Sequence, residues 1–144
     1  MNCWENTWAK VYWFNRKKAV QQVDELLKLG TNPDIVDSSK RTVLMQASYY
    51  GYVEITEKLI NANADVNLKD VSGTSALCIA CNNNQTEIAK KLIASGALID
   101  AKDVYGMTPL MRAAMMGYTE VIKLLVSEGA DLTIQDDTGK KASD

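Results

Sequence analysis

A constant spacing of 33 residues constrains the fold more than any other feature of the chain. The aspartates that mark it are Asp37, Asp70, Asp103 and Asp136. Other residue types keep the same phase: Thr42, Ser75 and Thr108; Leu44, Leu77 and Leu110; Ala47, Ala80 and Ala113; Leu59, Leu92 and Leu125. A period of roughly 20 to 50 residues is typical of proteins built from stacked supersecondary units. We therefore expect a row of similar units in which each unit contacts its neighbours.

The copy at residues 103–136 is the most complete. Its short patterns are Thr-Pro-Leu at 108–110, Ala-Ala at 113–114 and Gly-Ala-Asp at 129–131. With these patterns, residues 37–139 resemble the ankyrin repeat, and residues 9–36 resemble it more loosely. The resemblance implies an all-α solenoid of stacked helix-turn-helix units with β-turn fingers.

The repeat period also divides the chain, which we expect to be a single ankyrin-repeat domain over residues 1–144. The expected units are a capping repeat at 1–36, repeats at 37–69, 70–102 and 103–135, and the start of an incomplete repeat at 136–144. Helices are expected at about 43–50, 53–61 and 86–94, and Thr108 with Pro109 is expected to begin another.

Three residues replace the glycine that other copies have at a turn or helix end. Asn63 and Asn84 stand at helix ends, and asparagine tolerates the left-handed conformation that glycine adopts there. Lys40 stands at a turn tip, where we expect an altered or slightly strained turn.

The first fourteen residues contain all three tryptophans. Trp4, Trp8, Val11 and Tyr12 have the spacing of one stripe of a helix. Two interpretations remain open for this aromatic segment. It forms a ligand platform, or it plugs the open end of the first repeat, which has no preceding neighbour. We favour the plug.

Composition disfavours most enzyme classes. The chain of 144 residues has a net charge of −2 and no histidine, which removes the commonest general base and the commonest transition-metal ligand. No paired carboxylates, phosphate-binding loop or nucleophile–base set is evident. The balanced charge does not indicate nucleic acid or an anionic membrane as the main partner. No apolar run reaches the length of a membrane span, so we expect a cytoplasmic protein.

Cys78 and Cys81 form a Cys-x-x-Cys pattern, which can indicate a zinc or redox site. A structural zinc needs four ligands, and only Cys3 remains to complete the set. In the repeat phase the pair occupies positions that hold small or soft residues in the other copies. We therefore interpret both cysteines as packing residues and predict no metal and no cofactor.

The resemblance implies a concave groove lined by the turn tips and by the outer face of the first helix of each unit. The partner-binding residues predicted on this basis are Trp13, Arg16, Lys17, Arg41, Gln46, Tyr49, Tyr50, Ile79, Asn82, Tyr105, Met107, Arg112, Met115 and Met116. Exposed apolar surface usually marks an interaction site, and Tyr and Arg dominate interface energetics.

Three functions compete on these grounds. The favoured one is a non-catalytic protein–protein interaction module, an adaptor or an inhibitor, whose partner is a protein or peptide with an acidic portion facing the basic first two units. The alternative is a structural unit that assembles end to end through its C-terminal repeat. An enzyme is the least favoured. A homo-oligomer is possible but not required.

Overall fold

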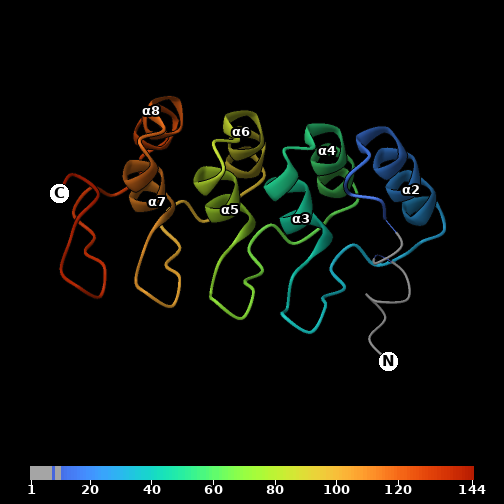
Figure 1. Ribbon diagram of the computed structural model, residues 1–144, viewed down its shortest axis with the longest axis horizontal. Coiled ribbons are helices and arrows are strands. Elements are labelled where there is room, and N and C mark those ends of the chain that lie inside the picture. The colour runs from blue at the N-terminus through green and yellow to red at the C-terminus, as the bar shows by residue number, and fades with distance from the viewer. Residues whose placement is uncertain (1–7, 9–10) are drawn as a thin grey trace.

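The computed structural model describes residue 8 and residues 11–144 of the chain. Among these residues, seven α-helices follow one another along an elongated molecule (Figure 1). Their bounds are α2 (Arg16–Lys28), α3 (Val43–Tyr50), α4 (Val53–Asn61), α5 (Ala76–Asn82), α6 (Thr86–Ala94), α7 (Pro109–Met116) and α8 (Thr119–Ser127). The all-α prediction and the helices expected at 43–50, 53–61 and 86–94 are confirmed.

The helices form two rows. Helices α3, α5 and α7, called the inner helices below, pack side by side next to the loops that project as fingers (Figure 1). Helices α2, α4, α6 and α8, called the outer helices, form the other row. The hairpin of α5 with α6 contacts both the hairpin before it, α3 with α4, and the hairpin after it, α7 with α8. The core is therefore a continuous ribbon and not a ball, as expected for stacked repeats.

The periodic aspartates shape the fingers. Asp70 Oδ1 accepts hydrogen bonds from the backbone N–H of Ser72 at 2.8 Å and of Thr74 at 3.0 Å. Equivalent pairs of bonds are made by Asp37, Asp103 and Asp136. Neighbouring fingers are also joined by backbone bonds, for example from Val71 N–H to Ser39 O at 3.0 Å. The spacing of 33 residues thus corresponds to one identical turn, formed four times.

Positive φ angles occur at the three predicted non-glycine positions. Asn63 has φ +62°, Asn84 has φ +59° and Lys40 has φ +59°. The two asparagine predictions are confirmed. The finger at Lys40 keeps the shape of the others, so any strain there lies in a lysine holding a left-handed conformation and not in an altered turn.

The first helix of each repeat begins at a hydroxyl residue. The Thr42, Ser75 and Thr108 side chains accept from the backbone N–H three residues later, which satisfies an otherwise unpaired donor. Pro109 follows Thr108 at the first helical position, where its missing N–H costs nothing. The sequence therefore determines the start of each inner helix locally.

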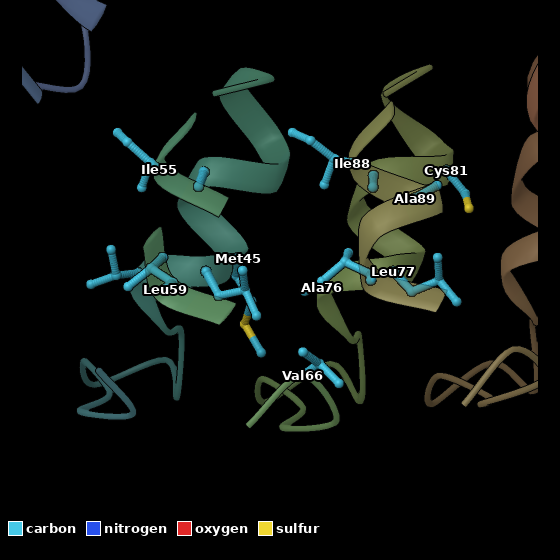
Figure 2. Close-up of a cluster of buried hydrophobic side chains, with 14 of the residues drawn as sticks. Met45, Ile55, Leu59, Val66, Ala76, Leu77, Cys81, Ile88 and Ala89 are labelled. Atoms are coloured by element: carbon cyan, nitrogen blue, oxygen red, sulfur yellow. The ribbon is translucent and has the colours of Figure 1, made fainter. Parts of the chain in front are cut away.

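The apolar positions of the repeat fill the space between hairpins. Figure 2 shows Ile55, Leu59, Leu77 and Ile88 pointing between neighbouring helices, and all four are buried. The leucines and alanines that keep the repeat phase are buried in every copy: Leu44, Leu77 and Leu110; Leu59, Leu92 and Leu125; Ala47, Ala80 and Ala113. Burying one leucine side chain contributes about 1.5–3 kcal/mol.

The N-terminal segment differs from the expected helix. Residues 11–15 are not helical, and 58% of the Tyr12 surface is exposed. The Tyr12 N–H donates to Gln22 Oε1 at 2.8 Å, and Asn15 caps α2 by accepting from Lys18 N–H. The prediction of a helical stripe through Val11 and Tyr12 is wrong, because Asn15 begins a new helix directly after them. Trp4 lies outside the described residues.

The tryptophans that are described close the first repeat. Trp8, Val11 and Trp13 are buried, and the Trp13 ring stacks on Tyr50 and Tyr52 with centroid distances of 5.9 and 6.2 Å. The plug interpretation is confirmed for Trp8 and Trp13.

Candidate functional site

The finger side of the stack contains a cavity of about 330 Å³ that spans three successive repeats. Seven of the predicted partner-binding residues line it: Arg41, Gln46, Tyr49, Ile79, Asn82, Tyr105 and Arg112. They come from the fingers and from α3, α5 and α7, because the repeat period places equivalent positions of the inner helices side by side. This cavity is called the groove below.

Two tyrosines are the most exposed apolar residues of the groove. Tyr49 lies at the end of α3 with 56% of its surface exposed, and Tyr105 lies on the third finger with 65% exposed. Ile79 lies on α5 and is half-buried. The groove therefore offers two rings and one aliphatic side chain to a partner.

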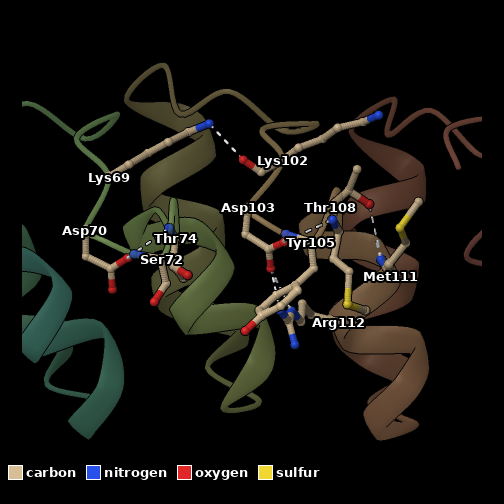
Figure 3. A network of polar contacts seen from close by, with 11 residues as sticks. Lys69, Asp70, Ser72, Thr74, Lys102, Asp103, Tyr105, Thr108, Met111 and Arg112 are labelled. Atoms are coloured by element: carbon tan, nitrogen blue, oxygen red, sulfur yellow. Dashed lines mark hydrogen bonds and ion pairs between the residues drawn. The ribbon is translucent and has the colours of Figure 1, made fainter. Parts of the chain in front are cut away.

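Arg112 is held in a defined position by Asp103. Its Nε donates to Asp103 Oδ2 at 3.1 Å, and its Nη2 donates to the same oxygen (Figure 3). Asp103 Oδ1 accepts from the backbone N–H of Tyr105 at 2.9 Å and of Met107 at 3.1 Å. Since both carboxylate oxygens are occupied, the guanidinium has little freedom to move.

The environment of this pair affects its protonation. Burial acts to raise the pKa of the Asp103 carboxyl, but the hydrogen bonds from Arg112, Met107 and Tyr105 outweigh burial and hold that pKa below its usual range. The pKa of Arg112 is raised, because its bond to Asp103 outweighs its own burial. Both groups are therefore charged at neutral pH.

The charges that line the groove balance. Arg112 is neutralised by Asp103, and Asp70 offsets Arg41 in number. Arg41 has no ion pair with another described residue, whereas Arg112 has one. The remaining N–H donors of Arg112 suit a hydrogen-bond acceptor of a partner, and Arg41 suits a carboxylate.

Three predicted methionines lie beyond this groove. Met107 and Met115 line a second hollow of about 350 Å³ beside the fourth finger. Met116 is exposed at the end of α7 and lines neither hollow. Met107 and Met115 therefore lie beside a second hollow of the finger side and do not line the groove.

Four other predicted residues lie toward the N-terminal end. Trp13 is buried, and Tyr50 is half-buried with its ring stacked on the rings of Trp13 and Tyr52. Arg16 and Lys17 lie in the first turn of α2, not on an inner helix, and line a hollow of about 510 Å³ that α4 helps to form. The sequence placed them on an inner helix because the phase of the later repeats was extended past Asn15.

Comparison with known families agrees with this geometry. The family model described as ankyrin repeats in three copies matches residues 12–103 and again residues 44–136. The chain belongs to the ankyrin repeat family. Ankyrin repeats are generally protein–protein interaction modules, and the family is typically non-catalytic. A search of the curated proteins finds no match.

Within this ankyrin stack, two further tyrosines share one phase of the repeat. Tyr52 and Tyr118 are half-buried, lie directly before α4 and α8, and pack against the core. The Tyr52 hydroxyl donates to Trp13 O, so the first ankyrin repeat is also tied to the N-terminal plug by a hydrogen bond.

The Cys-x-x-Cys pair of the second ankyrin repeat lies in the core. Cys78 and Cys81 are both buried with free thiols, which confirms the packing interpretation. Burial raises the pKa of the Cys78 thiol to about 11 and raises that of Cys81 further. Neither thiol is therefore ionised at neutral pH. Cys3 lies outside the described residues.

Sequence reasoning missed Asp103 as a groove residue. Asp103 shares the repeat phase of the other finger aspartates, so the sequence indicates only a role in the turn. In the structure it is also the ion-pair partner of Arg112. A signal was available, because only the third ankyrin repeat has a cation nine residues after this aspartate; Gln46 and Ile79 occupy that position in the earlier copies.

Among residue 8 and residues 11–144, no helix combines the length and the apolar character that crossing a lipid bilayer requires.

Proposed function

We propose that this ankyrin repeat protein is a non-catalytic binding module whose groove takes a segment of another protein or a peptide. By binding its partner in this groove, the protein acts as an adaptor or as an inhibitor that covers part of an enzyme or effector. Two buried free thiols suit a reducing compartment such as the cytoplasm.

The observation that carries the proposal is the set of side chains that converge on one cavity from three repeats. Tyr49, Ile79 and Tyr105 provide apolar contact surface, while Arg41 and Arg112 provide N–H donors. Aromatic residues and arginine are the types that dominate binding energy at protein interfaces. Because Asp103 holds Arg112, little side-chain entropy is lost when Arg112 bonds to a partner.

An acidic portion of the partner is expected to face the N-terminal half of the stack. Arg16, Lys17, Lys40 and Arg41 are exposed and have no ion pair within the described part of the chain. The charges that line the groove balance, so the electrostatic attraction of an acidic partner comes from these four residues and not from the groove as a whole. Steering of this kind raises the association rate and weakens with added salt.

The test is selection of random peptides displayed on phage against the intact protein, followed by titration of one enriched synthetic peptide. The double variant Tyr49→Ala/Tyr105→Ala should weaken that peptide about tenfold or more. Leu98→Ala removes an exposed apolar side chain outside the groove and should leave the affinity unchanged.

The proposal fails if the enriched peptides bind the double variant as tightly as the wild type. An affinity that does not change between low and high salt would remove the acidic portion from the proposal while leaving the groove.

A second candidate function is end-to-end assembly, which one observation favours. Ala114 and Ile122 are partly exposed at the C-terminal end of the stack, whereas their equivalents Cys81 and Ala89 are buried by the following repeat. Sedimentation velocity over a range of concentrations separates the two functions. A monomer at all concentrations rules out assembly, and association that Ile122→Lys abolishes supports it.

A further inference from the structure

Residues 12–18, Tyr-Trp-Phe-Asn-Arg-Lys-Lys, divide into a buried part and an exposed part. Trp13 is buried in the plug, whereas 94% of the Phe14 surface and 58% of the Tyr12 surface are exposed. Phe14 approaches the Tyr50 ring edge-on, with a centroid distance of 6.0 Å and an interplanar angle of 79°. Since Trp13 already closes the first repeat, the exposed Phe14 ring is not needed for that closure.

The same segment carries three cations that lack acidic partners. Arg16, Lys17 and Lys18 are exposed, and none forms an ion pair with any described residue. The Lys18 ammonium lies 3.7 Å from the centroid of the Tyr12 ring. Glu54 is the one acidic residue that lines the hollow beside Arg16 and Lys17. The segment therefore has an excess of positive charge next to two exposed rings.

Most other basic residues of the outer helices form ion pairs, although Lys90 of α6 forms none with a described residue. Lys28 and Lys58 both pair with Asp24, and Lys91 pairs with Glu57. Basic residues of the outer row thus differ in whether they have an acidic partner. On α2, the cations without such a partner all lie at the start of the helix, at residues 16–18.

A path of aromatic rings connects this segment with the groove. Phe14 contacts Tyr50, and Tyr50 contacts Tyr49 with a centroid distance of 5.2 Å. Tyr49 in turn lines the groove. Two steps of this size are covered by about four residues of an extended peptide, at ~3.3 Å per residue.

We infer that Tyr12, Phe14 and residues 16–18, called the aromatic–basic surface below, bind an acidic peptide segment that carries an aromatic or aliphatic side chain. The apolar side chain lies against Phe14, and the carboxylates contact Arg16, Lys17 and Lys18. The inference rests on the proposed function, because this segment continues from the peptide held in the groove, about four residues from the residue at Tyr49.

Charge complementarity favours an acidic peptide over an anionic membrane. A helix that binds a membrane surface inserts its apolar face, but Ala19 and Val23 on that face of α2 are buried in the stack. Only the first turn of the helix and the two rings remain available. The net charge of −2 also disfavours a long polyanion such as nucleic acid as the partner.

The experiment measures binding of the intact protein to a random copolymer of glutamate and tyrosine, with poly-glutamate as the probe that lacks the ring. The wild type should bind the copolymer more tightly. Phe14→Ala should reduce that affinity about fivefold, and Arg16→Gln/Lys17→Gln/Lys18→Gln should reduce it about tenfold and flatten its salt dependence. Lys140→Gln/Lys141→Gln, which removes two exposed cations at the other end, should have less than about a twofold effect.

These side chains are exposed, so the variants should fold, which circular dichroism and urea unfolding verify. Wild-type affinity in both the Phe14 and the triple variant overturns the inference. So does tighter binding to vesicles of phosphatidylcholine and phosphatidylserine than to the copolymer, if Phe14→Ala removes that vesicle binding. A wild type that binds neither polymer overturns it as well.

The peptide selected on phage separates this inference from the proposed function. If Tyr105→Ala weakens that peptide and the Phe14 and triple variants do not, the groove stands and the aromatic–basic surface falls. If the N-terminal variants weaken it and Tyr105→Ala does not, the surface stands and the groove falls. Weakening by both sets supports both proposals.

Discussion

The two ends of the stack are built from the same kind of helical hairpin but are finished differently. At the N-terminal end, Trp8 and Trp13 pack over the first repeat and are buried. At the C-terminal end, Ala114 and Ile122 are partly exposed, although their equivalents one repeat earlier are buried. The C-terminal side has the fourth finger beside it, but no helix follows that finger in the structure.

This difference shows that burial in a repeat protein depends on the neighbour as much as on the residue. Cys81 and Ala114 share one phase and are both small, yet only Cys81 has a helix of the next repeat packed over it. In a stack with nearest-neighbour contacts, each interface contributes its own stability. Substitutions at the N-terminal end closed by Trp8 and Trp13, or in the interior, should therefore cost more stability than substitutions at the C-terminal end near Ala114 and Ile122, called the open end below.

The largest effect is expected in the plug. Trp13→Ala removes a buried ring that stacks on Tyr50 and Tyr52, and it should lower the free energy of unfolding by about 3–5 kcal/mol. Ile122→Ala at the open end should cost only about 1 kcal/mol, because Ile122 is partly exposed. Urea unfolding followed by circular dichroism measures both values.

Trp13→Phe is the control for this comparison. Trp13 Nε1 is buried without a hydrogen-bond partner among the described residues. Replacing the indole by a phenyl ring therefore removes no hydrogen bond to those residues. Trp13→Phe should therefore cost clearly less than Trp13→Ala. Equal effects of Trp13→Ala and Ile122→Ala would contradict the distinction between the two ends.

A smaller effect is expected from the ion pair of the third repeat. Arg112→Leu leaves Asp103 charged, with 1% of its side chain exposed, and should destabilise the protein by about 3 kcal/mol at neutral pH. Gln46→Leu, at the same repeat position near the closed end, has no such pair and should cost less than 1 kcal/mol. Urea unfolding at several pH values provides the measurement.

The pH dependence gives a second readout for the same variant. The pKa of Asp103 in the folded protein lies below its ordinary value of 3.8, so the carboxylate stabilises the fold above that pH. This stabilisation is lost as the pH falls from 3.8 through the folded-state pKa. The difference between wild type and Arg112→Leu should shrink over that range, and a difference that stays constant there would refute the role assigned to Asp103.

The next effect compares two adjacent alanines of α7. Ala113 is fully buried, so Ala113→Leu should overpack the core and cost about 1–2 kcal/mol. Ala114 faces the open end, and Ala114→Leu should change stability by less than about 0.5 kcal/mol. A comparable loss in both variants, measured by urea unfolding, would mean that the open end is packed as tightly as the interior.

The smallest effect concerns the outer helices. Lys58 of α4 pairs with Asp24 of α2 at 3.0 Å and so links two units, whereas Lys123 pairs with Glu120 within α8 at 3.5 Å. Lys58→Gln should lower the thermal midpoint slightly, and Lys123→Gln should not change it measurably. The small shift for Lys58→Gln should disappear in concentrated salt, which scanning calorimetry at two salt concentrations checks.

Much of the fold could be predicted because local residues specify it. Thr108, Pro109 and Gly117 determine where α7 begins and ends, and the structure has the helix between them. Asn63 and Asn84 adopt the predicted left-handed conformation. The error at Tyr12 arose where the repeat period no longer applies, because Asn15 caps a helix that begins earlier than the phase of the later repeats indicates.

The site was less predictable from the sequence than the fold. The phase correctly brings Tyr49, Ile79 and Arg112 to one groove. The phase does not reveal that Asp103 neutralises Arg112 or that Trp13 stacks in the core, since both facts depend on side-chain contacts across loops. It also does not reveal that Met107 and Met115 line a second hollow and not the groove.

The sequence alone determined the repeated unit, because one finger aspartate, one hydroxyl cap and one set of leucines recur every 33 residues. Each of these residues acts through hydrogen bonds or contacts within its own unit or with the next unit. Only the tertiary structure decided what happens where the period ends. There the burial of Trp13, the exposure of Phe14 and the exposure of Ile122 depend on whether another element packs over them. Local hydrogen bonds can be read from residue order, but burial is a property of the surrounding structure.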